Sequence, residues 1–78
     1  MIVTTFNCQG LASLPKKIDV RRLVEDQFID VLFLQEIMGD GQILAGELEL
    51  MLSQWVFISL HAKGKSRGFL LGWRSRHF

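Results

Sequence analysis

The sequence has little cysteine, no long hydrophobic run and almost no charge imbalance, and the first two shortages exclude classes of protein. The single cysteine, Cys8, cannot form an internal disulfide and has no partner for a zinc site, so we expect a reducing compartment and a small buried side chain. No stretch approaches the roughly 18 apolar residues of a membrane span, and "MIVTTFNCQG" lacks the basic start and apolar run of a secretory signal. We therefore expect an intracellular protein, nuclear or cytoplasmic, with no membrane partner.

Charge is balanced overall but unevenly distributed. Nine Lys and Arg against eight Asp and Glu leave a net charge of +1, which by itself favours no class of partner. The end of the chain is a basic tail without an acidic residue, made of Lys63, Lys65, Arg67, Arg74 and Arg76. Such a tail could contact phosphate groups or could simply be a solvated end, and the sequence leaves both interpretations open.

The order of apolar and polar residues predicts a β-α-β-α-β-β chain within one small domain of 78 residues. β-Branched and apolar runs predict strands, helical spacing of apolar residues predicts helices, and "CQGLASLPKK" is typical of a loop. The expected strands are residues 1–7, 29–36, 55–60 and 69–73, the last two forming a hairpin through "HAKGKSRG"; the expected helices are 18–28 and 42–54.

The second strand, "IDVLFLQE", is almost continuously apolar, which is typical of a strand covered on both faces. Two helices cannot cover both faces of a sheet built from such strands, so the pattern indicates the opening portion of a larger layered α/β domain. A bland alternative is a chain that has no stable fold and aggregates through its exposed strand edges.

Several motifs have an ordinary interpretation beside a functional one. "HAKGKS" matches the end of the phosphate-binding loop G-x-x-x-x-G-K-[ST], but Ser59 stands at the first glycine and a strand follows in place of a helix, which favours a basic hairpin turn. His61 and His77 are too far apart to indicate a zinc site. Trp55 and Trp73, like the phenylalanines, are expected in the core and not as base-stacking platforms.

Asn7 and Glu36 form the most informative pair, because each ends a predicted strand of one β-α-β unit. The strands of such a unit are parallel, so both side chains should emerge at the same edge of the sheet, where open α/β sheets bind ligands. A carboxylate and an amide oxygen there could hold Mg²⁺. The alternative is that Asn7 caps a turn and Glu36 is an ordinary charge at the end of a strand.

The motifs "TTFNCQGL", "DVLFLQE" and "WVFISLHAKGKSRGFLLGW", with a helix between each, resemble the amino-terminal part of the endonuclease/exonuclease/phosphatase superfamily. The similarity is greatest to the endonuclease domains of plant non-LTR retrotransposons. It spans residues 1–78 but only the first part of the family's domain, so the resemblance implies an amino-terminal fragment with a partial four-layer α/β sandwich of the DNase-like type.

The resemblance also implies a function and site residues. Glu36 matches the family's metal-binding glutamate, and Asn7 matches the asparagine that helps to organise the metal and the scissile phosphate. The implied catalytic and metal residues are thus Asn7 and Glu36, the cofactor is Mg²⁺, and the reaction is phosphodiester hydrolysis of nucleic acid, with DNA the first expectation. RNA, phospholipid and inositol phosphate stay open as ancestral substrates.

The sequence also departs from the family. Gln9 stands where some relatives have an acidic residue, and Met38 stands where a lysine is common. The later D-x-N motif and the terminal Asp-His pair have no counterpart, and they supply the proton transfer that such hydrolysis uses. We therefore expect a truncated domain that is not active alone and that a carboxyl-terminal segment could complete. The competing hypothesis is a non-catalytic fragment that binds nucleic acid weakly through the basic tail.

Overall fold

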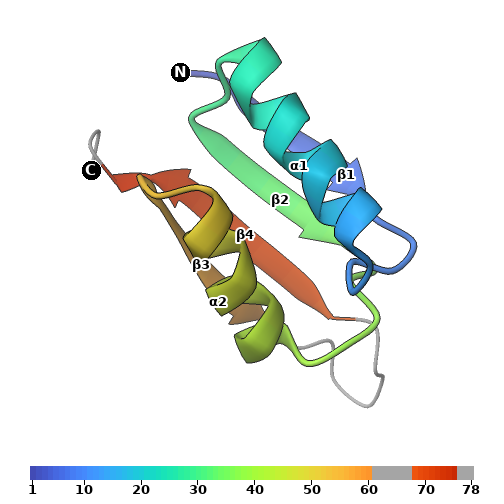
Figure 1. Ribbon diagram of the computed structural model, residues 1–78. Helices are drawn as coiled ribbons and strands as arrows, with labels where there is room; N and C mark the ends of the chain where they lie inside the picture. Colours follow the sequence, from blue (N-terminus) through green and yellow to red (C-terminus); the bar gives the residue numbers. More distant parts are fainter. Residues whose placement is uncertain (61–67, 76–78) are drawn as a thin grey trace.

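The computed structural model describes residues 1–60 and 68–75, which form a small mixed α/β domain with two helices beside a four-stranded sheet (Figure 1). The order of these elements along the chain is the expected β-α-β-α-β-β. Their bounds are β1 Val3–Asn7, α1 Leu14–Gln27, β2 Val31–Gln35, α2 Gly41–Met51, β3 Trp55–Leu60 and β4 Phe69–Arg74.

The sheet has the strand order β1-β2-β4-β3. β1 and β2 are parallel, with Val3 opposite Val31 and Asn7 opposite Gln35, as the β-α-β pattern predicts. β4 is antiparallel both to β2 and to β3, so the expected pairing of the last two strands is confirmed. Their connection, residues 61–67, lies outside the described residues, as does the interpretation of "HAKGKS" as a turn.

α1 begins four residues earlier than its apolar spacing predicts, at Leu14, so the last four residues of the expected loop are helical. Two residues interpreted as loop formers in fact start the helix. Ser13 is the N-cap, and its hydroxyl accepts a hydrogen bond from the Lys16 N–H at 3.4 Å. Pro15 lies in the first turn, where the missing N–H would have no partner within the helix.

α2 ends three residues earlier than expected, at Met51, with Leu52 as its C-cap. Its first turn is capped by Asp40, whose Oδ1 accepts hydrogen bonds from the N–H groups of Gln42 and Ile43 at 3.0 and 3.2 Å. A salt bridge of 3.3 Å joins the two helices, between the nearly buried Lys17 of α1 and Glu47 of α2.

Both helices lie on the same face of the sheet, α1 beside β1 and β2 and α2 beside β3 and β4 (Figure 1). The core lies between them, and each strand contributes alternate residues to it. On the sheet side it contains Leu32, Leu34, Leu70, Trp55 and Phe57, which meet Val20, Val24, Leu44 and Leu48 of the helices.

The opposite face of the sheet is not covered by either helix, and this corrects part of the expected core. β2 was expected to be covered on both faces, but Phe33 is only half-buried because it points to the helix-free side. Trp73 is half-buried on that side too, whereas Trp55 is in the core as expected. Phe28 is 77% exposed because it is the left-handed C-cap of α1 and turns away from the helix's apolar side.

No helix within residues 1–60 and 68–75 is long and apolar enough to cross a membrane.

Candidate functional site

Asn7 and Glu36 meet at the carboxyl end of the parallel strand pair, as their positions in the sequence predict. Asn7 is the last residue of β1 and Glu36 directly follows β2. The Asn7 Nδ2 group donates a hydrogen bond of 2.8 Å to Glu36 Oε2. Parallel pairing produces this contact, because it places the ends of the two strands at one edge of the sheet.

The hydrogen bonds show which atoms of the pair face a ligand. Asn7 Oδ1 accepts a hydrogen bond of 3.1 Å from the Gln9 N–H, so the amide oxygen is turned toward the following loop. Within the described chain, Glu36 Oε1 accepts no hydrogen bond. The Glu36 carboxylate is therefore the group that is available to a cation, while Asn7 orients that carboxylate.

The backbone around Glu36 is held on both sides. Glu36 has a φ of 53°, in the left-handed region that costs a non-glycine residue about 1–2 kcal/mol. Its carbonyl accepts the Gly10 N–H at 2.9 Å, and the Ile37 N–H donates to the Gly68 carbonyl at 3.2 Å. These bonds extend the sheet beyond both strands, so the position of the carboxylate is fixed by backbone pairing.

The loop after β1 supplies part of the backbone pairing around Glu36. The sequence does not predict this contact. Gly10 adopts a φ of 99°, a conformation that glycine adopts most readily, and donates the bond to Glu36. The Leu11 N–H then donates to the Ile37 carbonyl at 2.9 Å. Gly10 was interpreted only as a loop residue, and its place three residues after Asn7 was the signal for a tight turn back to β2.

The pair fits Mg²⁺ in part. Mg²⁺ prefers oxygen ligands and commonly uses one or two carboxylates, with water and substrate phosphate completing its shell. Glu36 supplies such a carboxylate, but the expected second ligand, Asn7 Oδ1, is turned to Gln9. In the described residues no group of three or more His, Cys, Asp and Glu side chains gathers as a metal cluster.

Gln9 and Met38, at which the sequence differs from the superfamily that it resembles, lie close to the site in the sequence. Gln9 and Met38 are exposed and both have left-handed backbone, with φ of 49° and 53°. Neither supplies the charge that an acidic residue or a lysine would bring. The charged contact that the resemblance implies at these two positions has no counterpart in Gln9 and Met38.

Cys8 follows Asn7 directly but points away from the site. Its side chain is fully buried in the core, as predicted. Burial raises the pKa of the thiol from 9.0 to about 11, against a smaller opposing effect of the Lys16 charge. At neutral pH the thiol is protonated and enclosed, so Cys8 is not a nucleophile or a metal ligand.

The basic tail is described only at Arg74. Its guanidinium lies over the ring of Trp55, 5.3 Å from the centroid, and donates a hydrogen bond of 2.9 Å to the Ile29 carbonyl. Arg74 is thus a structural residue that joins β4 to the segment before β2. His61, Lys63, Lys65, Arg67, Arg76 and His77 lie outside the described residues, and the predictions made for them stay untested.

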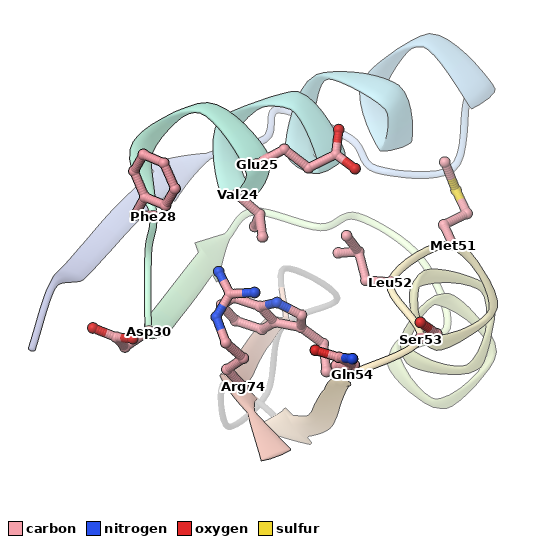
Figure 2. Close-up of a pocket in the computed structure, with 10 residues that line it drawn as sticks. Val24, Glu25, Phe28, Asp30, Met51, Leu52, Ser53, Gln54 and Arg74 are labelled. Carbon is pink, nitrogen blue, oxygen red and sulfur yellow. The ribbon is translucent and has the colours of Figure 1, made fainter. Parts of the chain in front are cut away.

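A cavity of about 880 Å³ lies at the other end of the sheet from Glu36, between the ends of the two helices (Figure 2). Val24 and Leu52 face it from the two sides, and Arg74 approaches from β4. The charged groups that line it already have partners: Glu25 pairs with Arg21 at 3.4 Å, and Asp30 accepts the Ile2 N–H at 2.8 Å.

Trp55 also lines this cavity, and its Nε1 has no hydrogen-bond partner within the described chain. The nitrogen is itself enclosed, so a molecule in the cavity would not reach it without a rearrangement of the surrounding side chains. The cavity therefore presents an apolar wall and engaged charges, with Ser53 and Gln54 as its uncharged polar side chains.

The Asn7–Glu36 pair is the strongest candidate site in the described chain. Comparison with known proteins adds no assignment to it: no family model, no curated protein and no solved structure matches the chain.

Proposed function

We propose that the edge of the sheet at Asn7 and Glu36 is one half of a Mg²⁺-dependent phosphodiesterase site of the endonuclease type. The observation that supports this is the hydrogen bond of 2.8 Å from Asn7 Nδ2 to Glu36 Oε2 at the carboxyl end of two parallel strands. Asn7 holds one carboxylate oxygen of Glu36 in a fixed position, and the other oxygen accepts no hydrogen bond within the described chain. A glutamate at the end of a strand that is simply solvated does not require such a neighbour. The resemblance of "TTFNCQGL" and "DVLFLQE" to the endonuclease/exonuclease/phosphatase superfamily points to the same two residues.

The chemistry assigns a separate role to each residue. Glu36 Oε1 would bind the cation, and the Asn7 amide would hold the carboxylate in place and offer its remaining N–H to a phosphate oxygen. Bound Mg²⁺ would supply positive charge to the phosphate during attack by water. The described residues contain no histidine to accept the proton of that water, and no group of three or more His, Cys, Asp and Glu side chains gathers among them. The proposal is therefore a metal-binding half-site that needs further residues for turnover.

A DNase-like fold for the whole domain is part of the same proposal. The described part is a two-layer α/β arrangement, and its helix-free sheet face is apolar. In a four-layer sandwich of the DNase-like type a second sheet would cover that face, and a carboxyl-terminal segment of the same domain would supply both this sheet and the missing acid and base. The substrate that fits the resemblance best is DNA.

The test is a Mg²⁺ titration followed by amide NMR on the wild-type chain, Glu36→Gln and Asp26→Asn. The last is a matched control, because Asp26 is an exposed carboxylate near the far end of α1. We expect the amide signals of Asn7, Gly10 and Glu36 to move in the wild type and in Asp26→Asn and to stay fixed in Glu36→Gln. Equal shifts in all three proteins would refute the half-site.

A nicking assay on supercoiled DNA checks the second part of the proposal. We expect no Mg²⁺-dependent nicking by the chain alone, because the described part of the chain places no histidine at the site to accept a proton. Nicking that requires both Mg²⁺ and Glu36 would show that the chain is a complete enzyme. Nicking that is insensitive to Glu36→Gln would come from a contaminant.

A further inference from the structure

The sheet ends in two edge strands, β1 and β3, whose outward-facing backbone groups have different partners. Alternate residues of a strand direct their N–H and C=O groups to opposite sides. The Gln54 carbonyl accepts the Ser75 N–H at 2.7 Å, so Gln54 faces β4, and the next residue along the chain faces away from it. The N–H groups that a further strand would use at this edge therefore belong to Trp55, Phe57 and Ser59.

Two of these three outward N–H groups already have acceptors. The Trp55 N–H donates to the Leu52 carbonyl at 2.9 Å, in the turn that leads from α2 into β3. The Phe57 N–H donates at 2.9 Å to Oε2 of Glu49, eight residues earlier in the chain. Glu49 is at an exposed position of α2, so its side chain reaches the strand from outside the core. A carboxylate thus lies at the middle of the β3 edge, where a neighbouring strand would place a carbonyl.

α2 also follows β3 along its length (Figure 1). At its first residue, Gly41, an added Cβ would clash with the Oγ of Ser59, so the helix begins in direct contact with the strand. At its other end the helix leads through Leu52 into Trp55. Cover by a helix is one of the ways in which native sheets prevent the addition of a strand at an edge.

β1 has no such cover at its outer edge. The Cys8 N–H donates to the Gln35 carbonyl at 2.9 Å, so the even-numbered residues of β1 face β2. The outward-facing residues are Val3, Thr5 and Asn7. No group within residues 1–60 and 68–75 bonds to their backbone N–H or carbonyl groups. β1 also contains no proline and no charged residue, which are common protections of an edge strand.

We propose that Glu49 blocks the addition of a strand at the β3 edge, so that β1 is the edge at which this sheet can be extended. An incoming strand would have to displace the carboxylate from the Phe57 N–H. The displaced charge would then lie beside the new strand without this partner, and burial of an unpaired charge is costly. This role of Glu49 does not depend on Mg²⁺ or on Glu36, so the metal half-site and the blocked edge can fail independently.

The first experiment compares two amides of the wild-type chain by hydrogen exchange followed by NMR. The N–H groups of Phe57 and Thr5 both lie on the outer side of an edge strand, and only that of Phe57 has an acceptor in the described chain. After correction for their intrinsic rates, we expect Phe57 to exchange more slowly than Thr5 by on the order of tenfold or more. Equal rates would overturn the proposal.

The second experiment removes the acceptor. Glu49→Ala should bring the exchange of Phe57 close to that of Thr5. It should also shift the onset of self-association, measured by sedimentation velocity, to concentrations roughly tenfold lower than in the wild type. Glu25→Ala is the matched control, because it makes the same change at an exposed position of α1. Glu49→Gln keeps an acceptor oxygen at the same reach and should keep the slow exchange.

The proposal requires faster exchange and stronger association together. Slow exchange of Phe57 in Glu49→Ala would show that the carboxylate does not close the edge. Faster exchange with no more association than in the wild type and Glu25→Ala would show that the bond does not block a strand. Either result overturns the proposal. If Glu49→Ala does not fold, the wild-type comparison of Phe57 with Thr5 still decides.

Discussion

The two faces of the sheet are made from alternate residues of the same strands, yet they have different environments. Leu32, Leu34 and Leu70 point to the helices and are fully buried. Their neighbours Val31, Phe33 and Leu71 point to the face of the sheet that neither helix covers, the open face, and are only half-buried. The chemical character of the two sets is the same, so the difference arises from the helices, which both pack on one side.

This comparison shows what an apolar strand does and does not specify. In a strand whose apolar and polar residues alternate, the sequence indicates which face is covered, because the polar residues lie on the solvent-exposed face. β2 has apolar residues at its first four positions, so its sequence does not indicate which face is exposed to solvent. Its sequence therefore requires cover on both faces, and the described chain supplies cover for one.

The largest expected effect separates two adjacent residues of β2. Leu32→Ala should lower the free energy of unfolding by about 2–5 kcal/mol, because it removes a fully buried side chain and leaves a cavity. Phe33→Ala should cost less in the monomer, about 1–2 kcal/mol, since the ring is only half-buried. Urea denaturation at low protein concentration measures both.

The concentration matters for this pair of variants. If the cost of Phe33→Ala grew with protein concentration while that of Leu32→Ala did not, the open face would be covered in the associated state. Equal costs at high dilution would contradict the difference between the two faces, because Phe33 would then be as well packed as Leu32.

A smaller effect is expected at a glycine on the helix-covered face. A Cβ on Gly72 would lie 2.4 Å from the ring of Phe57, so Gly72→Ala forces a core side chain to move and should destabilise the protein by about 1–3 kcal/mol. Gly46→Ala is the control, because Gly46 is exposed in α2 and nothing lies within 4 Å of the added methyl group. That variant should be stabilised by about 0.5–1 kcal/mol.

Thermal unfolding of the two glycine variants should therefore give shifts of opposite sign. If both alanines stabilised the protein, β4 would not approach Phe57 as closely as the structure has it. If both alanines destabilised the protein, the expectation that Gly46 of α2 has room for a methyl group would be wrong.

The arrangement of the elements could be predicted from sequence because it depends on local patterns. Alternation of strand and helix, the parallel pairing of β1 with β2 and the meeting of Asn7 with Glu36 follow from short-range periodicity and from the geometry of a β-α-β unit. The start of α1 was wrong because Ser13 and Pro15 are common both in loops and in first helical turns, and apolar spacing does not distinguish the two.

Other features depended on long-range packing, which no local pattern encodes. The insertion of β4 between β2 and β3, the left-handed backbone of Glu36 and its bond to Gly10 all join segments far apart in the chain. The orientation of the Asn7 amide is different, because it is local: its oxygen accepts the N–H of Gln9, two residues further on. The sequence therefore predicted that Asn7 and Glu36 meet, and its alternative interpretation, that Asn7 caps a turn, accounts for the orientation of the amide oxygen.

The effect that is smallest at neutral pH concerns Cys8, whose thiol titration shows whether the helix-covered side excludes water. Its thiol pKa is raised from 9.0 to about 11 because burial disfavours the thiolate. Between these two values the folded chain holds a proton that the unfolded chain has lost, so the stability contributed by the neutral thiol falls as the pH rises from about 9 to about 11. Thiolate absorbance should titrate near 11 in the folded chain and near 9 in denaturant, and Cys8→Ala should remove both signals. A folded-state titration near 9 would mean that Cys8 is open to solvent, and the helix-covered face would then be less well sealed than the contrast with the open face requires.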